Sequence, residues 1–475
     1  MFRLVFITAV MLMIGHQAQA AVKWNNKSNS SNEELTVKFQ VENELLPQNY
    51  PTKLLSFYPH KYANISENNH LFISLYASED LSNDGRNEIF GAIYVFDEND
   101  EYHTSIPAKP FILEWNENED KLQASQTWRD IFPEMIFPRR FETFKNQRDG
   151  TLDIFIADYG VDGLSPKHPN CGGQNRWFQI KGDNILDKTQ YLPNQNDLTH
   201  DLVVEDLNKD GLADLIVVND PVPKYSNKKK CGNKKLDEKP YILMSSNDGF
   251  KKYYFDEIGI NKKHLYLAGG AKINADSSFD LVLSRDGLHS SGGIDIYNFK
   301  IKNLKPELNK KTSLSLSGTD LGADVRKGDL DGDGRIEFVV SNSASEDWKG
   351  NNLYVVSNEG GKWQVSKLFY ESKLHGHLGK KDQGWCERIF LIDIDGNSTA
   401  DYVCANRSKP DNLMRPPVII RKDSKYLPLE LQNSRIRQFV PFKIPSARML
   451  IGTRYGRAGA NDVMLEWQFH GFEIQ

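Results

Sequence analysis

The chain has 475 residues, of which 39% are hydrophobic, and its formal net charge is -5 at pH 7. This acidic balance argues against a general nucleic-acid-binding protein, which is usually basic. The length suffices for a large core, and 19 tyrosines and 25 phenylalanines suit half-buried strands.

Residues 1–20 have the pattern of a secretory signal peptide. Arg3 supplies a positive start, Leu4 to Ile14 form an apolar stretch, and small residues precede a cut near Ala20. A membrane anchor is the alternative, but the apolar run is too short to span a bilayer comfortably. No later stretch approaches the ~20 apolar residues of a spanning helix. We therefore expect an exported protein, secreted or periplasmic.

A short acidic loop, followed by β-branched and aromatic residues, recurs six times at intervals of 57 to 66 residues. The first position of this loop falls at Asp80, Lys145, Asp206, Lys272, Asp329 and Asp393. A fixed period indicates an array of similar units. We therefore predict a flexible segment at residues 21–34 and one repeat domain over residues 35–475.

Each acidic loop lies between two apolar strands, such as Leu71–Tyr76 before the first loop and Leu215–Val218 after the third. The loop is therefore expected to join two antiparallel strands. About 40 residues remain in each unit, which is room for two more strands. Four strands per unit make the blade of a β-propeller. We predict an all-β, seven-bladed β-propeller of four-stranded antiparallel blades; six or eight blades are the alternatives, because three repeats are weak.

The last unit contributes only three strands, which end near Phe469. The segment Leu35–Val41 alternates apolar and polar residues, as a strand with one buried face does. We predict that Leu35–Val41 pairs with Val463–Phe469 and closes the ring, since closure removes an exposed edge. The alternatives are that the segment lies against the outside or starts its own blade.

The acidic loops have the spacing of a cage for a hard cation. Calcium takes six to eight oxygens, here side chains at positions 1, 3, 5 and 9 and a carbonyl at position 7, while glycine at position 6 turns the chain. Magnesium fits worse, because it requires octahedral geometry and retains its waters. The expected calcium ligands are Asp80, Ser82, Asp84, Arg86 and Glu88; Asp206, Asn208, Asp210, Leu212 and Asp214; Asp329, Asp331, Asp333, Arg335 and Glu337; Asp393, Asp395, Asn397, Thr399 and Asp401.

A metal-free hairpin is the alternative for any one loop, because Asp, Asn and Gly favour turns for other reasons. Four copies in register favour calcium, although Ser398 replaces the glycine in the last copy. The loops at Lys145–Asp153 and Lys272–Asp280 have lost their first acid. We expect no tight metal site in these two loops, where a lysine ammonium could replace the cation.

The repeats resemble the FG-GAP or VCBS repeats of integrin-alpha-type β-propellers and of bacterial surface proteins, over residues 70–453. The resemblance implies calcium-binding loops that stiffen the blades. It implies no single function, because the family includes adhesins, lectin-like binders, scaffolds and accessory domains of carbohydrate-active enzymes.

Four cysteines in an exported chain predict two disulfides. Cys386 and Cys404 flank the sixth loop almost equally, so we expect them to lie opposite each other on paired strands. Cys171 and Cys231 each follow the second strand of neighbouring units, which favours a bridge between blades. Zinc thiolates are the alternative, but no CxxC spacing is present.

The connections that leave each second strand are long and polar, and they are expected on the rim opposite the acidic loops. We predict a ligand face there for a protein or glycan partner, with solvated loops as the alternative. The residues expected on this face are Arg285, His289, Trp348, Arg407 and Arg454.

No catalytic motif is evident, so we favour a binding, adhesion or scaffold module, with calcium as the cofactor. The alternative is a polysaccharide lyase or hydrolase on the same fold. Asp286 with His289, or Asp162 with His168, would then serve as acid and base, and His375 would join them in one pocket.

Overall fold

The computed structural model describes residues 35–40, 52–57, 70–97, 100–118, 121–161, 171–182, 184–193, 196–220, 239–260, 264–286, 292–316, 321–343, 351–372, 376–377, 386–393, 399–406, 418–422, 425–429, 436–444, 447–454 and 463–468. No helix within these ranges is long and apolar enough to cross a membrane.

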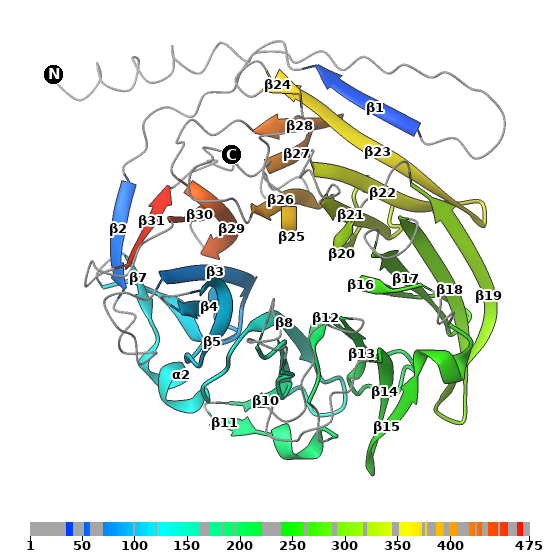
Figure 1. The fold of residues 1–475 in the computed structure, drawn as a ribbon, viewed down its shortest axis with the longest axis horizontal. Helices are drawn as coiled ribbons and strands as arrows, with labels where there is room; N and C mark the ends of the chain where they lie inside the picture. Colours follow the sequence, from blue (N-terminus) through cyan, green and yellow to red (C-terminus); the bar gives the residue numbers. More distant parts are fainter. Residues whose placement is uncertain are drawn as a thin grey trace, which may run out of the picture.

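The described strands form six sheets that follow one another around a ring (Figure 1). The first sheet contains β3 (His70–Glu79), β4 (Glu88–Asp97), β5 (Asp100–Ile106), β6 (Phe111–Asn116) and β7 (Lys121–Ala124). The next contains β8 (Pro138–Lys145), β9 (Leu152–Asp158), β10 (Arg176–Lys181) and β11 (Asn184–Asp187). Two further four-stranded sheets contain β12 (Thr199–Glu205), β13 (Asp214–Asn219), β14 (Tyr241–Ser246) and β15 (Gly249–Tyr254), and β16 (Tyr266–Ile273), β17 (Ser278–Arg285), β18 (Gly293–Lys302) and β19 (Lys305–Ser315).

The remaining two sheets are larger. One contains β20 (Leu321–Gly328), β21 (Glu337–Ser343), β22 (Asn351–Glu359), β23 (Lys362–Ser372), β24 (Gly376–His377) and β1 (Leu35–Gln40). The other contains β25 (Cys386–Ile392), β26 (Asp401–Asn406), β27 (Val418–Lys422), β28 (Lys425–Leu429), β29 (Ile436–Ile444), β30 (Ala447–Arg454), β31 (Val463–Gln468) and β2 (Thr52–Phe57). This eight-stranded sheet has two four-stranded parts that meet at one pairing, Ala405 with Gln438.

The first strand of each unit lies nearest the axis of the ring (Figure 1). These strands contact one another in a closed circuit: β3, β8, β12, β16, β20, β25, β29 and again β3. Four antiparallel strands per unit, arranged in this way, make a β-propeller. The predicted all-β propeller is confirmed.

The cores of neighbouring blades are continuous, because each sheet is covered on both faces. All six residues of β13 are buried, and its central four, Leu215 to Val218, are a continuous apolar run rather than an alternating one. Between the first two blades Phe90 stacks on Phe141, with ring centroids 4.2 Å apart. The helix α2 (Gln126–Ile131) ends beside Phe132, which packs edge-on against Phe90.

The strand that closes the ring is β2, so the prediction for Leu35–Val41 is wrong. β2 pairs antiparallel with β31, from Thr52 opposite Gln468 to Phe57 opposite Val463. β1 lies parallel to β23 on the outer edge of another blade, as one of the alternatives proposed. Alternation identifies a strand but not its partner, because the outer edge of every blade offers the same unpaired backbone groups.

This pairing predicts two different truncation results. Deleting residues 1–40 should cost little stability, because β23 keeps its pairing with β22. Deleting residues 1–57 should lower the melting temperature markedly and promote aggregation, because the edge of β31 becomes exposed. Thermal scans with light scattering measure both. Equal melting temperatures for the two truncated chains would contradict the assignment of β2.

Candidate metal centre

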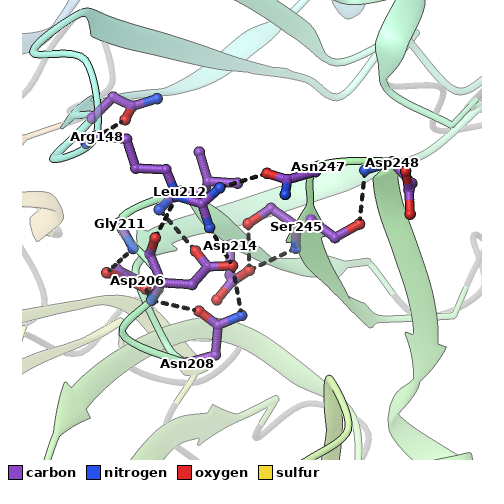
Figure 2. Close-up of polar contacts among 12 residues, drawn as sticks. Arg148, Asp206, Asn208, Gly211, Leu212, Asp214, Ser245, Asn247 and Asp248 are labelled. Carbon is purple, nitrogen blue, oxygen red and sulfur yellow. Dashed lines mark hydrogen bonds and ion pairs between the residues drawn. The ribbon is translucent and has the colours of Figure 1, made fainter.

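Three acidic loops hold their first aspartate in the same way. Asp206 accepts the backbone N–H groups of Asp210 and Gly211 on its two carboxylate oxygens, both at 2.8 Å (Figure 2). Asp80 accepts the equivalent two N–H groups at 3.0 and 2.9 Å. Asp329 accepts N–H groups from positions 4 and 6 of its loop at 2.7 and 2.9 Å. The chain is therefore wrapped around the first carboxylate in each loop.

The glycine at position 6 makes this wrapping possible. Gly85, Gly211 and Gly334 have φ angles of 85°, 86° and 80°, a region that other residues rarely adopt. The carboxylate at position 5 then accepts the N–H of position 7 at 2.8 to 2.9 Å in all three loops. Because this frame uses backbone donors, the side chains of positions 1 and 5 are oriented by the loop itself.

The closing acid of each loop, at position 9, lies at the start of the second strand. Glu88, Asp214 and Glu337 each accept the N–H of the leucine at position 2, at 2.6 to 2.9 Å. Burial, with a smaller contribution from neighbouring loop acids, raises the pKa of each to about 7. A cation in the loop would favour the charged form of such a buried acid.

Among the described acidic loops, the Asp329 loop brings the most carboxylates together. Carboxylate oxygens of Asp329, Asp331 and Asp333 all lie within 4.8 Å of one another. Asp329 is half-buried and the other two are exposed. Arg335 pairs with Asp333 through Nε at 2.6 Å, so a guanidinium already balances part of this charge. A cluster of carboxylate oxygens without nitrogen or sulfur suits a hard cation.

The Asp206 loop has a guanidinium partner from the neighbouring blade (Figure 2). Arg148 lies 3.2 Å from Asp210, measured from Nη2 to Oδ2, and donates to Asn247 Oδ1 at 2.6 Å. The closing Asp214 accepts both N–H and O–H of Ser245, at 2.6 and 2.9 Å. The sequence analysis missed Arg148 and Ser245, because neither belongs to the loop that it contacts.

The two incomplete loops satisfy their closing acids with neutral donors. Asp153 accepts Trp177 Nε1 at 2.9 Å and Gln179 Nε2 at 3.0 Å. Asp280 accepts the amide groups of Asn274 and Asn298 at 2.9 and 2.8 Å. In these two loops, neutral N–H groups therefore donate to the closing carboxylate that would otherwise bind a cation.

The expectation that a lysine replaces the cation is wrong for Lys272 and stays a prediction for Lys145. Lys145 is exposed, and Lys272 donates to the carbonyl of Ile336 in the next loop, at 3.4 Å. The Lys272 side chain starts near the end of its inner strand and extends out of its own loop. Only the short Asp side chain folds back onto the turn.

Neighbouring acidic loops contact one another around this rim of the propeller. Gln147 donates its backbone N–H to Gly211 at 3.1 Å, and Lys209 Nζ donates to the carbonyl of Asn274 at 3.1 Å. Ala400, in the last loop, donates to the carbonyl of Asp329 at 3.1 Å. A change in one loop therefore acts directly on the next blade.

The last loop is described only at its ends. Asp393 and Thr399 are half-buried and Asp401 is buried. Asp395 and Asn397 lie outside the described residues, so the site expected there stays a prediction.

Comparison with known proteins supports the repeat assignment. Residues 147–217 match the family model described as FG-GAP-like repeat. The predicted resemblance is confirmed over these residues, which run from the second acidic loop through the third. No curated protein matches the sequence.

Several solved structures are similar to the chain in fold. AofleA from Arthrobotrys oligospora has 8% identity and a TM-score of 0.40, over 90% of this chain and 98% of that one. The N-terminal domain of Nup159 has 7% identity and a TM-score of 0.38, over 85% and 96%. A putative exo-beta-1,3-galactanase from Bifidobacterium bifidum s17 has 12% identity and a TM-score of 0.34, over 62% and 91%. Values this low say nothing about what the present chain binds.

The ligand face expected opposite the FG-GAP-like loops is contradicted at Arg285. This side chain is buried and donates to both oxygens of Asp295, at 3.0 and 2.6 Å. Although burial opposes the charge, Asp295 raises the pKa of Arg285. Arg285 therefore belongs to an ion pair inside its blade. His289, Trp348 and Arg407 lie outside the described residues, as does the side chain of Arg454, so their role stays a prediction.

The enzyme alternative is likewise untested. Asp286 is buried, whereas Asp162, His168, His289 and His375 lie outside the described residues.

The strand register corrects the expected placement of Cys386 and Cys404, whereas the disulfide predicted between them stays a prediction. Cys386 lies opposite Asn406 and Cys404 lies opposite Ile389, so the two cysteines are not directly opposed. A bulge after Cys386 shifts the register. Cys171 is disulfide-bonded, and no described cysteine is free. Cys231 lies outside the described residues, so its pairing with Cys171 stays a prediction.

A buried ion cluster joins the inner strands across the axis; we call Arg140, Asp201 and Asp324 the central clasp. Arg140 of β8 donates from Nε to Asp201 of β12 and from Nη2 to Asp324 of β20. Asp201 also accepts the N–H of Gly269 in β16 at 2.8 Å, and Asp324 that of Ile389 in β25 at 2.6 Å. Five inner strands are therefore linked to the guanidinium of Arg140, two of them through the carboxylates of Asp201 and Asp324.

His200 of β12 lies beside the clasp in its neutral form. Its Nδ1–H donates to the carbonyl of Leu267 at 2.7 Å, and its Nε2 accepts from Arg139 at 2.9 Å. Burial and the Arg139 guanidinium hold the pKa of His200 well below its usual range.

This environment predicts that stability falls in mild acid. Below the ordinary histidine pKa of about 6.5 the unfolded chain binds a proton at residue 200 that the folded chain excludes, so the free energy of unfolding decreases as pH falls. Urea unfolding at pH 7.5 and 5.5 measures the decrease. His200→Gln keeps a donor and an acceptor without titrating and should reduce the pH dependence. The same dependence in both proteins would contradict this role.

Proposed function

We propose that the chain is an exported, calcium-binding β-propeller that acts as a binding, adhesion or scaffold module for a protein or glycan partner. The observation that carries the calcium part is the cluster of Asp329, Asp331 and Asp333, whose carboxylates lie within 4.8 Å of one another. The signal-peptide pattern at residues 1–20 supports export. Exported proteins commonly contain disulfides, and extracellular modules commonly contain calcium sites of millimolar affinity.

The ligands of each site come from one loop. In the Asp329 loop the acids at positions 1, 3, 5 and 9, with the carbonyl of Arg335, would hold the ion. The loops of Asp80 and Asp206 share its hydrogen-bond frame. Bound calcium would neutralise the acids and fix the turn between the inner strand and the second strand of the same blade. Because neighbouring loops touch, it would also stiffen the contacts between blades.

A glycan array tests the binding function. The purified, labelled chain is applied to the array in the presence of calcium. Binding to a limited set of glycans would indicate a glycan partner, and binding to none would favour a protein partner. Binding should weaken in chelator, because bound calcium would stiffen the blades that carry the predicted ligand face on the opposite rim. Turnover of a bound polysaccharide, detected as new reducing ends, would favour the enzyme alternative and contradict a pure binding module.

A further inference from the structure

A cavity of about 260 Å³ lies at the acidic-loop end of the propeller axis. It is lined by middle and last residues of the inner strands β3, β8, β12, β16, β20 and β25. The central clasp lies one to two residues deeper along β8, β12 and β20, where its three side chains are buried. The cavity therefore ends at the clasp and faces the loop side.

The walls combine apolar side chains with charged ones. Ala77, Val203 and Val325 are among the apolar residues, while the charged ones are Glu79, Glu142, Glu205, Arg326 and Lys327. An apolar pocket with a few convergent polar groups is the usual form of a small-ligand site.

The two cations of this cavity are already paired. Arg326 Nη1 lies 2.6 Å from Glu142 Oε1, and Lys327 pairs with Glu205. That accounts for two of the three glutamates.

Glu79 is the remaining acid. Its side chain is exposed to the cavity, and within the described part of the chain its carboxylate has no hydrogen bond and no ion pair. The cavity thus carries three acidic side chains against two cations. Burial and the neighbouring Glu142 raise the pKa of Glu79 to about 7, and a bound cation would favour its charged form.

We propose that this cavity binds a cationic group, a primary ammonium or guanidinium on a short apolar or aromatic stem, with Glu79 as its counter-ion. An anion would meet no free cation there. A divalent metal would find too few oxygens, since calcium takes six to eight. The volume lies just below the ~300–1,000 Å³ of drug-sized pockets, which suits a basic side chain or a small amine rather than an oligosaccharide.

This inference rests on the proposed function only in that the propeller binds a partner; it does not depend on calcium in the loops. It names the chemistry that the axial cavity recognises. The calcium content of the same protein sample, measured alongside, separates failure of this inference from failure of the calcium proposal.

The test is calorimetric titration of the full chain with three probes of similar shape. Tyramine is cationic, 4-ethylphenol is neutral and 3-(4-hydroxyphenyl)propionate is anionic. Tyramine should bind one to one and at least about tenfold more tightly than the other two probes. Truncating one partner of a desolvated charge pair typically costs more than about 1.4 kcal/mol of binding free energy, which corresponds to a tenfold change in Kd.

Three variants locate the site. Glu79→Gln should abolish the preference for tyramine, and Glu307→Gln, on an exposed part of β19, should leave it unchanged. Lys327→Met should tighten tyramine binding, because it frees Glu205 from its ion pair. Folding of each variant is checked by its melting curve. Equal binding of tyramine and 4-ethylphenol, or a Glu79→Gln chain that retains the preference, would overturn the proposal, and the gain in Lys327→Met supports it even if Glu79→Gln fails to fold.

Discussion

Replacing Arg140 by methionine should lower the free energy of unfolding by about 3–5 kcal/mol, the usual cost of removing one partner from a buried ion pair. The variant leaves Asp201 without its guanidinium partner, and Asp324 keeps only that of Arg326, whose Nε lies 3.5 Å from its Oδ1. Although burial opposes ionisation of Asp324, Arg140 and Arg326 hold its pKa below the usual range, so the acid is charged when the clasp is intact. Chemical unfolding followed by tryptophan fluorescence measures the loss.

Arg129→Met is the matched control, because Arg129 pairs with Asp130 at the surface, with Nε and Oδ1 3.5 Å apart. Exposed pairs contribute about 0–1 kcal/mol, so this variant should unfold nearly as the natural chain does. If the central clasp contributed little to global stability, the two variants would have similar free energies of unfolding. That result would contradict the view that Arg140 ties five inner strands together.

Removing calcium should lower the melting temperature by several degrees. Each loop occupied at a free calcium concentration of about 100 times its Kd adds about 2.7 kcal/mol to the folded state, because the unfolded chain lacks the cage. Scans in calcium and in excess chelator measure the difference. Added magnesium should restore little of it, since these loops offer flexible oxygen cages rather than octahedral sites. Identical scans in calcium, magnesium and chelator would contradict the proposal.

The period of the acidic loops was the most informative feature of the sequence. It placed loops such as Asp206–Asp214 between an inner strand and the next, where the structure has them. This prediction succeeded because the turn is formed by residues close in sequence. The glycine at position 6 and the acids at positions 1 and 9 make their hydrogen bonds within the same loop.

Long-range partners could not be predicted in the same way. The Leu35–Gln40 strand was recognised by its alternation, yet its place beside β23 depends on which blade edge is free. Arg140 looks like an ordinary strand residue, and only the ring brings it to Asp324, which is 184 residues away. Arg148 contacts the next blade for the same reason.

The cysteine register failed for a smaller reason. Counting from the loop centre assumes uniform pairing, but the hairpin closes with Ile392 opposite Asp401 and a bulge follows Cys386. This register already places Cys404 opposite Ile389, three residues from Cys386, and the bulge moves the partner of Cys386 by only one residue.

The central claim, that complete acidic loops are calcium sites and incomplete ones are not, is tested most directly by counting bound calcium. Equilibrium dialysis with elemental analysis should find calcium on the natural chain, and Asp333→Ala should lose one ion per chain. Asp149→Ala, which changes the same position of the incomplete second loop, should lose none. A natural chain without bound calcium, or an Asp333→Ala chain that retains the full number, would contradict the account.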